Sequence, residues 1–233
     1  MNLVDFIIIF IMAVSSIVGV YNGFVLSALN AASFILSWLC ALIFYPLFTK
    51  ILLAMFPNIL KTITYYAEGS SKILNIEDKT ANIALFTKDQ LTNMISNMKL
   101  PNPFNNVLTS DVFNSSKSIQ TLGEYFDSTI ANVIINILSF LLLFMLLKFL
   151  FTIVLSIAKA IVKLPILKQF DTAFGAGFGI LRGFFIVCFL FALIPILMTL
   201  APVDLITEYL DGSLLAGFFV KANIFTNFIS GKI

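Results

Sequence analysis

The residues of this 233-residue chain that are able to do chemistry are few, and several of them share one stretch. An acid, four glycines and the only arginine gather between residues 170 and 183: Asp171, Gly175, Gly177, Gly179, Arg182 and Gly183. Asp171, Gly175, Gly179 and Gly183 recur every fourth residue, so on a helix they form one stripe. A stripe without side chains lets another helix backbone come close, which is how helices associate in lipid. We interpret it as a helix-packing motif.

Catalytic and metal chemistry is poorly supported elsewhere. The chain contains no histidine. Its two cysteines, Cys40 and Cys188, lie inside apolar runs, and we predict that they are small buried hydrophobic residues. The glycine-rich stretch lacks the preceding strand and the lysine of a phosphate-binding loop. Asp5 and Asp171 lie near the ends of predicted spans, on opposite sides of the membrane, so they do not form an acid pair. We predict no enzyme, no catalytic residue, no metal and no cofactor.

Composition indicates a membrane protein. Hydrophobic residues make up 60% of the chain and charged residues 11%, whereas soluble domains are about half apolar and a quarter charged. Fourteen basic and twelve acidic residues give a net charge of +2, too balanced for a nucleic-acid binder. The expected surroundings are therefore the lipid bilayer, and the predicted fold class is an all-α, polytopic membrane protein.

Four transmembrane helices are predicted from runs of about 20 apolar residues. They are Leu3–Val20, Phe24–Tyr45, Ile130–Leu147 and Gly183–Ala201. Tyr21, Asn22 and Gly23 predict a tight turn, so the first two spans form an antiparallel hairpin. Gly19 and Gly23 flank this bend and let the two helices meet closely. Pro46 is expected to end the second span, and Pro195 to kink the fourth.

The remaining segments are predicted to be interfacial helices and one soluble helical insert. Leu47–Ala67 reads as an amphipathic segment at the membrane surface, and residues 68–127 as the insert. Within the insert, Thr87 and Gln90 have the spacing of a capping box, followed by apolar residues at helical spacing. That helix packs on the bundle or the lipid, or alternatively binds a partner. The predicted divisions are 1–46, 47–128, 129–201 and a tail, 202–233.

One face of the third span carries polar side chains. Asn132, Asn136 and Ser139 lie on it, and amides in hydrocarbon are costly unless they are paired. We expect this face to point into the bundle and to hold helices together. The alternative is a polar, water-lined pathway.

Charge predicts the orientation. Lys148, Lys159 and Lys163 lie on one stripe of a basic amphipathic helix, residues 148–163, suited to anionic headgroups. The positive-inside rule therefore places this connector in the cytoplasm, and both termini and the insert outside. Asp5, Lys148, Lys159, Lys163, Asp171 and Arg182 are assigned to the membrane interface. For Arg182 the alternative is an ion pair or gate, whose partner must come from another helix or protomer.

Two motifs together resemble the colicin V production protein family of bacterial inner-membrane proteins. The first is the start Asn2–Asp5, an apolar run, and then Asn22-Gly23-Phe24. The second is Asp-x3-Gly-x3-Gly-x2-Arg-Gly, beginning at Asp171. The resemblance covers roughly residues 1–200 and the insert only loosely. The first turn also lacks the basic residue that members often carry.

The resemblance implies an integral protein of the bacterial plasma membrane that is associated with bacteriocin production and secretion and with envelope homeostasis. No catalytic activity comes with it. The expected partners are other envelope proteins, with self-association as a further option. The alternative function, drawn from the polar face of the third span, is a small oligomeric channel or transporter.

Overall fold

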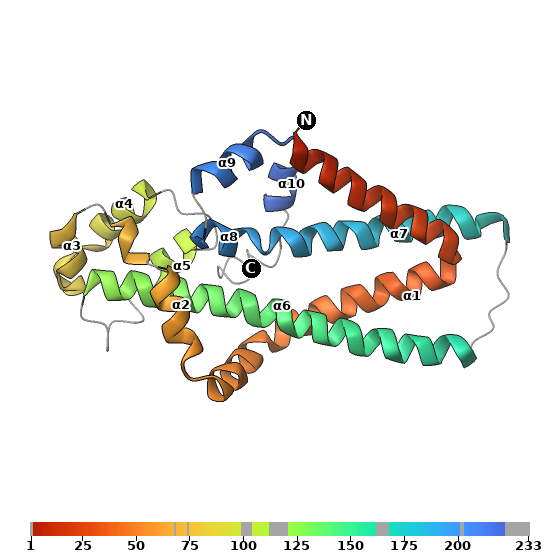
Figure 1. Cartoon of the computed structure of the whole chain (residues 1–233), viewed down its shortest axis with the longest axis horizontal. Helices are drawn as coiled ribbons and strands as arrows, with labels where there is room; N and C mark the ends of the chain where they lie inside the picture. Colours follow the sequence, from red (N-terminus) through yellow and green to blue (C-terminus); the bar gives the residue numbers. More distant parts are fainter. Residues whose placement is uncertain are drawn as a thin grey trace. The chain divides into compact units, whose positions relative to one another are not determined.

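A computed structural model describes residues 2–67, 69–73, 75–98, 104–111, 121–161, 168–200 and 203–221. Within these ranges the regular elements are helices, apart from one isolated bridge between Asn82 and Thr121, so the all-α prediction is confirmed. The elements in Figure 1 are α1 Leu3–Met55, α2 Ile59–Ala67, η1 Gly69–Lys72, α3 Ile76–Thr80, η2 Ile83–Leu85, α4 Lys88–Asn97, α5 Phe104–Asp111, α6 Leu122–Ile161, α7 Lys168–Phe191, α8 Ile194–Leu200, α9 Val203–Asp211 and α10 Ala216–Lys221.

The chain forms two compact units. The first, here the bundle unit, comprises Met1–Tyr45, Phe140–Ala192 and Asp204–Asn223. The second, the insert unit, comprises Pro46–Ser139, Leu193–Val203 and Ile224–Ile233. Helices α1 and α6 contribute to both, and each unit is described by itself below.

Helix α1 is a hairpin. At Gly23 the backbone leaves helical geometry with φ 73° and ψ 174°, a conformation that favours glycine because it has no Cβ. The chain reverses at this point, as the red and orange parts of α1 show in Figure 1. The predicted turn is therefore confirmed, with Gly23 as its one non-helical residue. Residues 3–22 are the first arm and residues 24–55 the second.

Pro46 does not end the second span, contrary to the prediction. Helix α1 continues through it to Met55. A proline removes one helical hydrogen bond, here to the carbonyl of Leu42, and a long helix with intact turns on both sides survives that loss. The break comes instead around Pro57, so the predicted interfacial segment Leu47–Ala67 is divided between α1 and α2.

The predicted third span and the basic helix after it are one helix. Helix α6 has 40 residues and a length of ~60 Å. Lysine is a good helix former, so Lys148 gives the chain no reason to stop. Among the described residues, three helices are long and apolar enough to cross a membrane: Leu3–Met55, Leu122–Ser156 and Asp171–Met198.

The glycine stripe lies inside a long helix. Helix α7 begins at Lys168, so the helix that contains the predicted fourth span starts before the glycines and not at Gly183. It ends at Phe191, four residues before Pro195. The proline has no N–H to donate to the Phe191 carbonyl, and its ring collides with that group. The kink expected at Pro195 is therefore a full break between α7 and α8.

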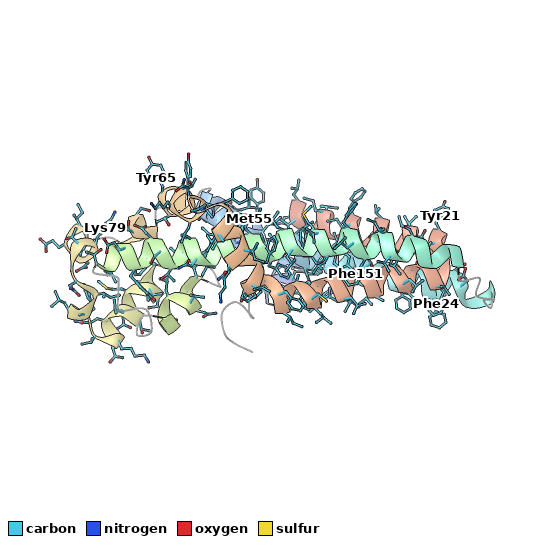
Figure 2. The ribbon with its side chains drawn as sticks, turned by 90° about the horizontal axis from the view of Figure 1, so that it is seen from below. Tyr21, Phe24, Met55, Tyr65, Lys79 and Phe151 are labelled. Atoms are coloured by element: carbon cyan, nitrogen blue, oxygen red, sulfur yellow. The ribbon has the colours of Figure 1, made fainter. Side chains whose placement is uncertain are left out.

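The two units bury different side chains. The core of the insert unit consists of Ile73, Ile83, Leu91, Ile95, Leu108, Leu122, Tyr125 and Phe126. In the bundle unit, apolar side chains such as Phe34 and Phe144 are buried too, but so are serines of α1, namely Ser15, Ser27, Ser33 and Ser37. The same unit exposes large apolar side chains such as Phe10 and Phe149, and Figure 2 shows that of Tyr21 projecting outward. Exposed apolar side chains around buried hydroxyls and close helix contacts are expected of helices that pack in lipid.

Candidate functional site at the crossing of α1 and α7

Helix α7 meets the first arm of α1 backbone to backbone. A Cβ added to Gly19 would overlap the carbonyl oxygen of Gly175 and lie 2.8 Å from the Cα of Gly179. A Cβ on Gly179 would lie 2.5 Å from the carbonyl oxygen of Ser15. These neighbours are main-chain atoms that have no freedom to rotate away. Only glycine fits, and the closeness explains why the stripe repeats every fourth residue.

The last glycine of the stripe continues the same contact more loosely. A Cβ on Gly183 would lie 3.2 Å from the Cα of Met12. Gly177, by contrast, has nothing within 4 Å of its added Cβ. The glycines of α7 that recur every fourth residue are therefore the ones that contact α1, whereas Gly177 does not take part.

Asp171 caps the bend of α1. Its Oδ1 accepts a hydrogen bond from the backbone N–H of Phe24 at 2.6 Å. The second arm begins at Phe24, and a helix start leaves N–H groups without partners inside the helix. A carboxylate at a helix N-terminus satisfies one of them and is stabilised by the helix dipole. Asp171 thus completes, from α7, the reversal that Gly23 permits. The sequence assigned it only to the membrane interface.

Arg182 bonds to α1. Its Nε donates to Ser15 Oγ at 3.0 Å and its Nη2 to the Ser15 carbonyl at 3.4 Å. Ser15 Oγ in turn donates to the carbonyl of Gly179 at 2.7 Å. Arg182 is therefore hydrogen-bonded to a serine of another helix, while Asp171 is bound to Phe24, and the ion pair of Arg182 stays a prediction.

Helix α7 lies between the two arms of α1 and presents a different face to each. The glycine face packs on the first arm. On the other face, Phe174 and Phe178 each lie with ring centroids 5.6 Å from that of Phe24. Phe185 lies 5.8 Å from Trp38, also on the second arm. Close backbone contact on one side and ring packing on the other hold α7 in the hairpin.

Asp5 ties the start of α1 to the tail. It is fully buried, and Oδ1 accepts from Ser213 Oγ at 2.6 Å and from the N–H of Leu215 at 3.0 Å. Oδ2 accepts from the N–H of Leu214 at 3.3 Å. Its position at the membrane interface stays a prediction, but its burial against the segment before α10 was not foreseen, because 208 residues separate Asp5 from Ser213.

Lys148 does not project from the bundle as an interfacial lysine would. It is half-buried, and its Nζ donates to Ser33 Oγ and to the carbonyl of Asn30. The same Nζ lies 5.3 Å from the ring centroid of Phe34. Of the other two residues of the predicted basic stripe, Lys163 lies outside the described residues, and the side chain of Lys159 is likewise not described.

The polar face predicted on the third span is divided. Ser139 is buried, and Asn136 is half-buried with its Oδ1 accepting from Thr49 Oγ1 at 3.3 Å. Asn132, however, is exposed, so its predicted inward orientation is wrong. Most other positions of α6 near it are apolar and buried in the insert unit, which leaves the stripe through Glu124 and Asn132 open.

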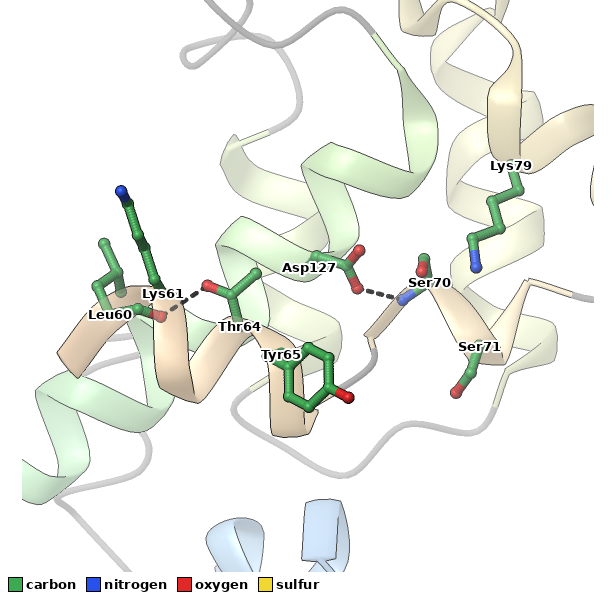
Figure 3. Close-up of a pocket in the computed structure, with 8 residues that line it drawn as sticks. All are labelled: Leu60, Lys61, Thr64, Tyr65, Ser70, Ser71, Lys79 and Asp127. Atoms are coloured by element: carbon green, nitrogen blue, oxygen red, sulfur yellow. Dashed lines mark hydrogen bonds between the residues drawn. The ribbon is translucent and has the colours of Figure 1, made fainter. Parts of the chain in front are cut away.

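A second candidate site lies in the insert unit. It is an open pocket of about 660 Å³ lined by Leu60, Lys61, Thr64, Tyr65, Ser70, Ser71, Lys79 and Asp127. In Figure 3, Lys79 extends toward Ser70 and Ser71 while Lys61 points away. Asp127 accepts from the N–H of Ser70 at 2.6 Å. These residues come from four separate elements, so no local sequence pattern was able to find the pocket.

The site residues around α1 and α7 offer packing and capping, and in the described part of the chain no three histidine, cysteine, aspartate or glutamate residues lie close enough to hold a metal ion. No curated protein and no solved structure matches the chain. Among protein families, the one described as colicin V production protein matches residues 4–86 and 112–223. These ranges contain both arms of α1 from Val4 onward and all of α7, and leave out α4 and α5. The chain belongs to the colicin V production protein family.

Proposed function

We propose that this protein is an accessory factor in toxin production, acting by contact with other envelope proteins and without catalysis of its own. Family membership supports a membrane protein in toxin production. The observation that carries the finer proposal is the crossing of α1 and α7. Each residue of the Asp171-to-Gly183 motif is used there to pack, cap or hydrogen-bond helices. A motif employed in this way supports an assembled surface as the functional feature.

The arrangement of the bundle unit supports four membrane passes: two arms of α1, then α6, then α7. Asp171 at the start of α7 binds Phe24, so the bend of α1 and the start of α7 lie at one end. Helix α6 runs antiparallel to the second arm, with Phe144 near Phe34 and Lys148 near Asn30. The C-terminal end of α6 therefore lies at the same end of the bundle unit as the bend.

We assign this end to the cytoplasm, because the segment from Lys148 to Asp171 holds four lysines and a single acid. Asp5 and Ser213 meet in the bundle unit, which supports a common side for the N-terminus and the tail. We assign that side, and the insert, to the outside of the inner membrane. A cysteine replacing the exposed Asn93, with Cys40 and Cys188 changed to alanine, should react with an impermeant reagent in intact cells. Labelling only after lysis would reverse the topology.

The amount of exported toxin tests the proposed accessory function. In cells that make a colicin-type bacteriocin, removal of this protein should lower toxin in the medium at unchanged toxin transcription, and the full chain should restore it. Gly177→Ala, at an open position, serves as the control that keeps activity. Toxin levels that do not respond to removal would contradict the proposal.

A channel or transporter is the second candidate function. The observation in its favour is the buried hydroxyl of Ser139, which has no hydrogen-bond partner in the described part of the chain, one turn from the Asn136–Thr49 pair. Purified protein in liposomes tests it. Ion flux that disappears in Asn136→Leu would support a pathway, whereas vesicles that stay impermeable would exclude one.

A further inference from the structure

Arg182 lies deep in its span. It is eleven residues from Asp171, where the candidate span begins, and nine from Phe191, where α7 ends, or ~16 Å and ~14 Å along the helix. The side chain reaches back toward Ser15, which is eight residues, ~12 Å, from the bend at Gly23. Its guanidinium is thus held inside the bundle unit, about two helical turns of α1 away from the bend.

The guanidinium is only partly satisfied there. Ser15 supplies two acceptors, Oγ to Nε and the carbonyl to Nη2, and Nη1 has none among the described residues. The residue is half-buried, so part of it is open to the surroundings. A charge in hydrocarbon is costly unless an opposite charge pairs with it, and a guanidinium matches a carboxylate in two parallel hydrogen bonds.

Among the described residues, no acid of the candidate spans provides that carboxylate. The acids within the candidate spans are Asp5, Glu124, Asp127 and Asp171, and each lies within six residues of the start of its span. Asp5 and Asp171 are already bound to backbone N–H groups. A second copy of the chain would bring the same four acids at the same depths. Charge complementarity therefore favours a different protein.

We propose that Arg182 is the docking point for a transmembrane helix of another protein that carries an aspartate or glutamate near the middle of its span. This inference deepens the proposed accessory function and rests on it, because it names the chemistry by which an envelope partner is recognised. The partner helix would lie against α7 and exclude lipid from the open side of the guanidinium. Its carboxylate would take the donors that Ser15 leaves free.

A defined probe tests the proposal without knowledge of the partner. The purified full chain is reconstituted in phosphatidylcholine vesicles at pH 8 with labelled leucine-based transmembrane peptides that carry Asp, Asn or Leu at their centre. Energy transfer is measured as a function of peptide-to-lipid ratio. The Asp peptide should bind about three- to tenfold more tightly than the Leu peptide, the range expected for one polar pair in a membrane.

Variants of Arg182 and Ser15 decide whether the charge of Arg182 causes the preference for the Asp peptide. Arg182→Gln should reduce the binding of the Asp peptide to that of the Leu peptide. Arg182→Lys should keep part of the preference for the Asp peptide. Ser15→Ala is the matched control: it removes the internal bond to Nε but leaves the charge, so the preference should persist. Equal loss in Ser15→Ala would assign the effect to a disturbed bundle and overturn the proposal.

Three other results would also overturn it. These are equal binding of the three peptides, Arg182-dependent self-association without peptide, and loss of the preference when phosphatidylglycerol is added, which would assign the site to lipid phosphate. The vesicle measurement does not involve toxin export. A peptide preference without any export phenotype would therefore contradict the accessory function alone, and an export phenotype without the preference would contradict the docking site alone.

Discussion

The bundle unit and the insert unit hold their helices together by different contacts. The insert unit gathers apolar side chains such as Leu91 and Ile95 in a core, because burial of apolar surface is favourable in water. The bundle unit also buries apolar side chains such as Phe34, but its α1 and α7 meet through glycines and a buried serine, and large apolar side chains such as Phe10 are exposed. In lipid, apolar burial gives no comparable gain, so close backbone contact and hydrogen bonds hold the helices. The surroundings of each unit, water or lipid, therefore determine which contacts hold its helices together.

The largest effect should come from breaking the backbone contact in the bundle unit. Gly179→Leu places a side chain against the Ser15 carbonyl and the Ser16 Cα, and neither can move without shifting α1. We expect a loss above about 3 kcal/mol, seen as protein missing from the membrane fraction. Gly177→Leu on the same helix should leave the amount unchanged, because its surroundings are open. Equal amounts of both variants would show that the contact does not hold the bundle together.

A cavity made in the core of the insert unit should have the next largest effect on stability. Ile95 is fully buried in the core around α4, so Ile95→Ala should lower the free energy of unfolding by about 2–5 kcal/mol. Limited proteolysis should then cut the insert unit faster while the bundle unit stays intact. Thr92→Ala on the exposed side of α4 is the control. Simultaneous loss of both units would mean that they unfold as one.

Removal of the cap on the bend should have a moderate effect. Asp171→Ala leaves the Phe24 N–H without its acceptor and should destabilise the protein by about 1–2 kcal/mol, measured by thermal unfolding in detergent. Asp171→Asn should recover most of the stability, because asparagine also caps helices well. If asparagine were as harmful as alanine, charge and not the hydrogen bond would be the important property.

The smallest effect should come from the surface of the insert unit. Thr87 accepts from the N–H of Gln90, whose side chain accepts from the N–H of Thr87. Both residues are exposed, so Thr87→Ala should cost about 1 kcal/mol or less of helix stability. Amide hydrogen exchange in the first turn of α4 is the measurement. Unchanged exchange there would show that the cap is not needed.

Local signals in the sequence predicted their structures well. Asn22-Gly23 predicted the turn, the spacing from Thr87 to Gln90 predicted the start of α4, and Pro195 predicted an interruption. Each depends on a few neighbouring residues whose chemistry is decided by sterics or by one hydrogen bond. Such features do not require knowledge of the rest of the fold.

Features that join distant segments were not predicted. The hydrogen bond between Asp171 and Phe24 joins residues that are 147 positions apart in the sequence. The one between Lys148 and Asn30 joins residues that are 118 positions apart. Asn132 was misassigned because periodicity gives a shared face but not the direction in which it points, and that depends on which neighbours surround α6. The stripe from Gly175 to Gly183 was recognised, but its partner on α1 required the fold.

The cap on the bend of α1 also has a consequence for the timing of biogenesis. Phe24 leaves the ribosome 147 residues before Asp171, which at about 5–20 residues per second is a delay of roughly 7–30 s. Throughout that interval the hairpin lacks the residue that caps the start of its second arm. The order of synthesis therefore makes α7 the element that completes the hairpin, before the tail that binds Asp5 through Ser213 follows.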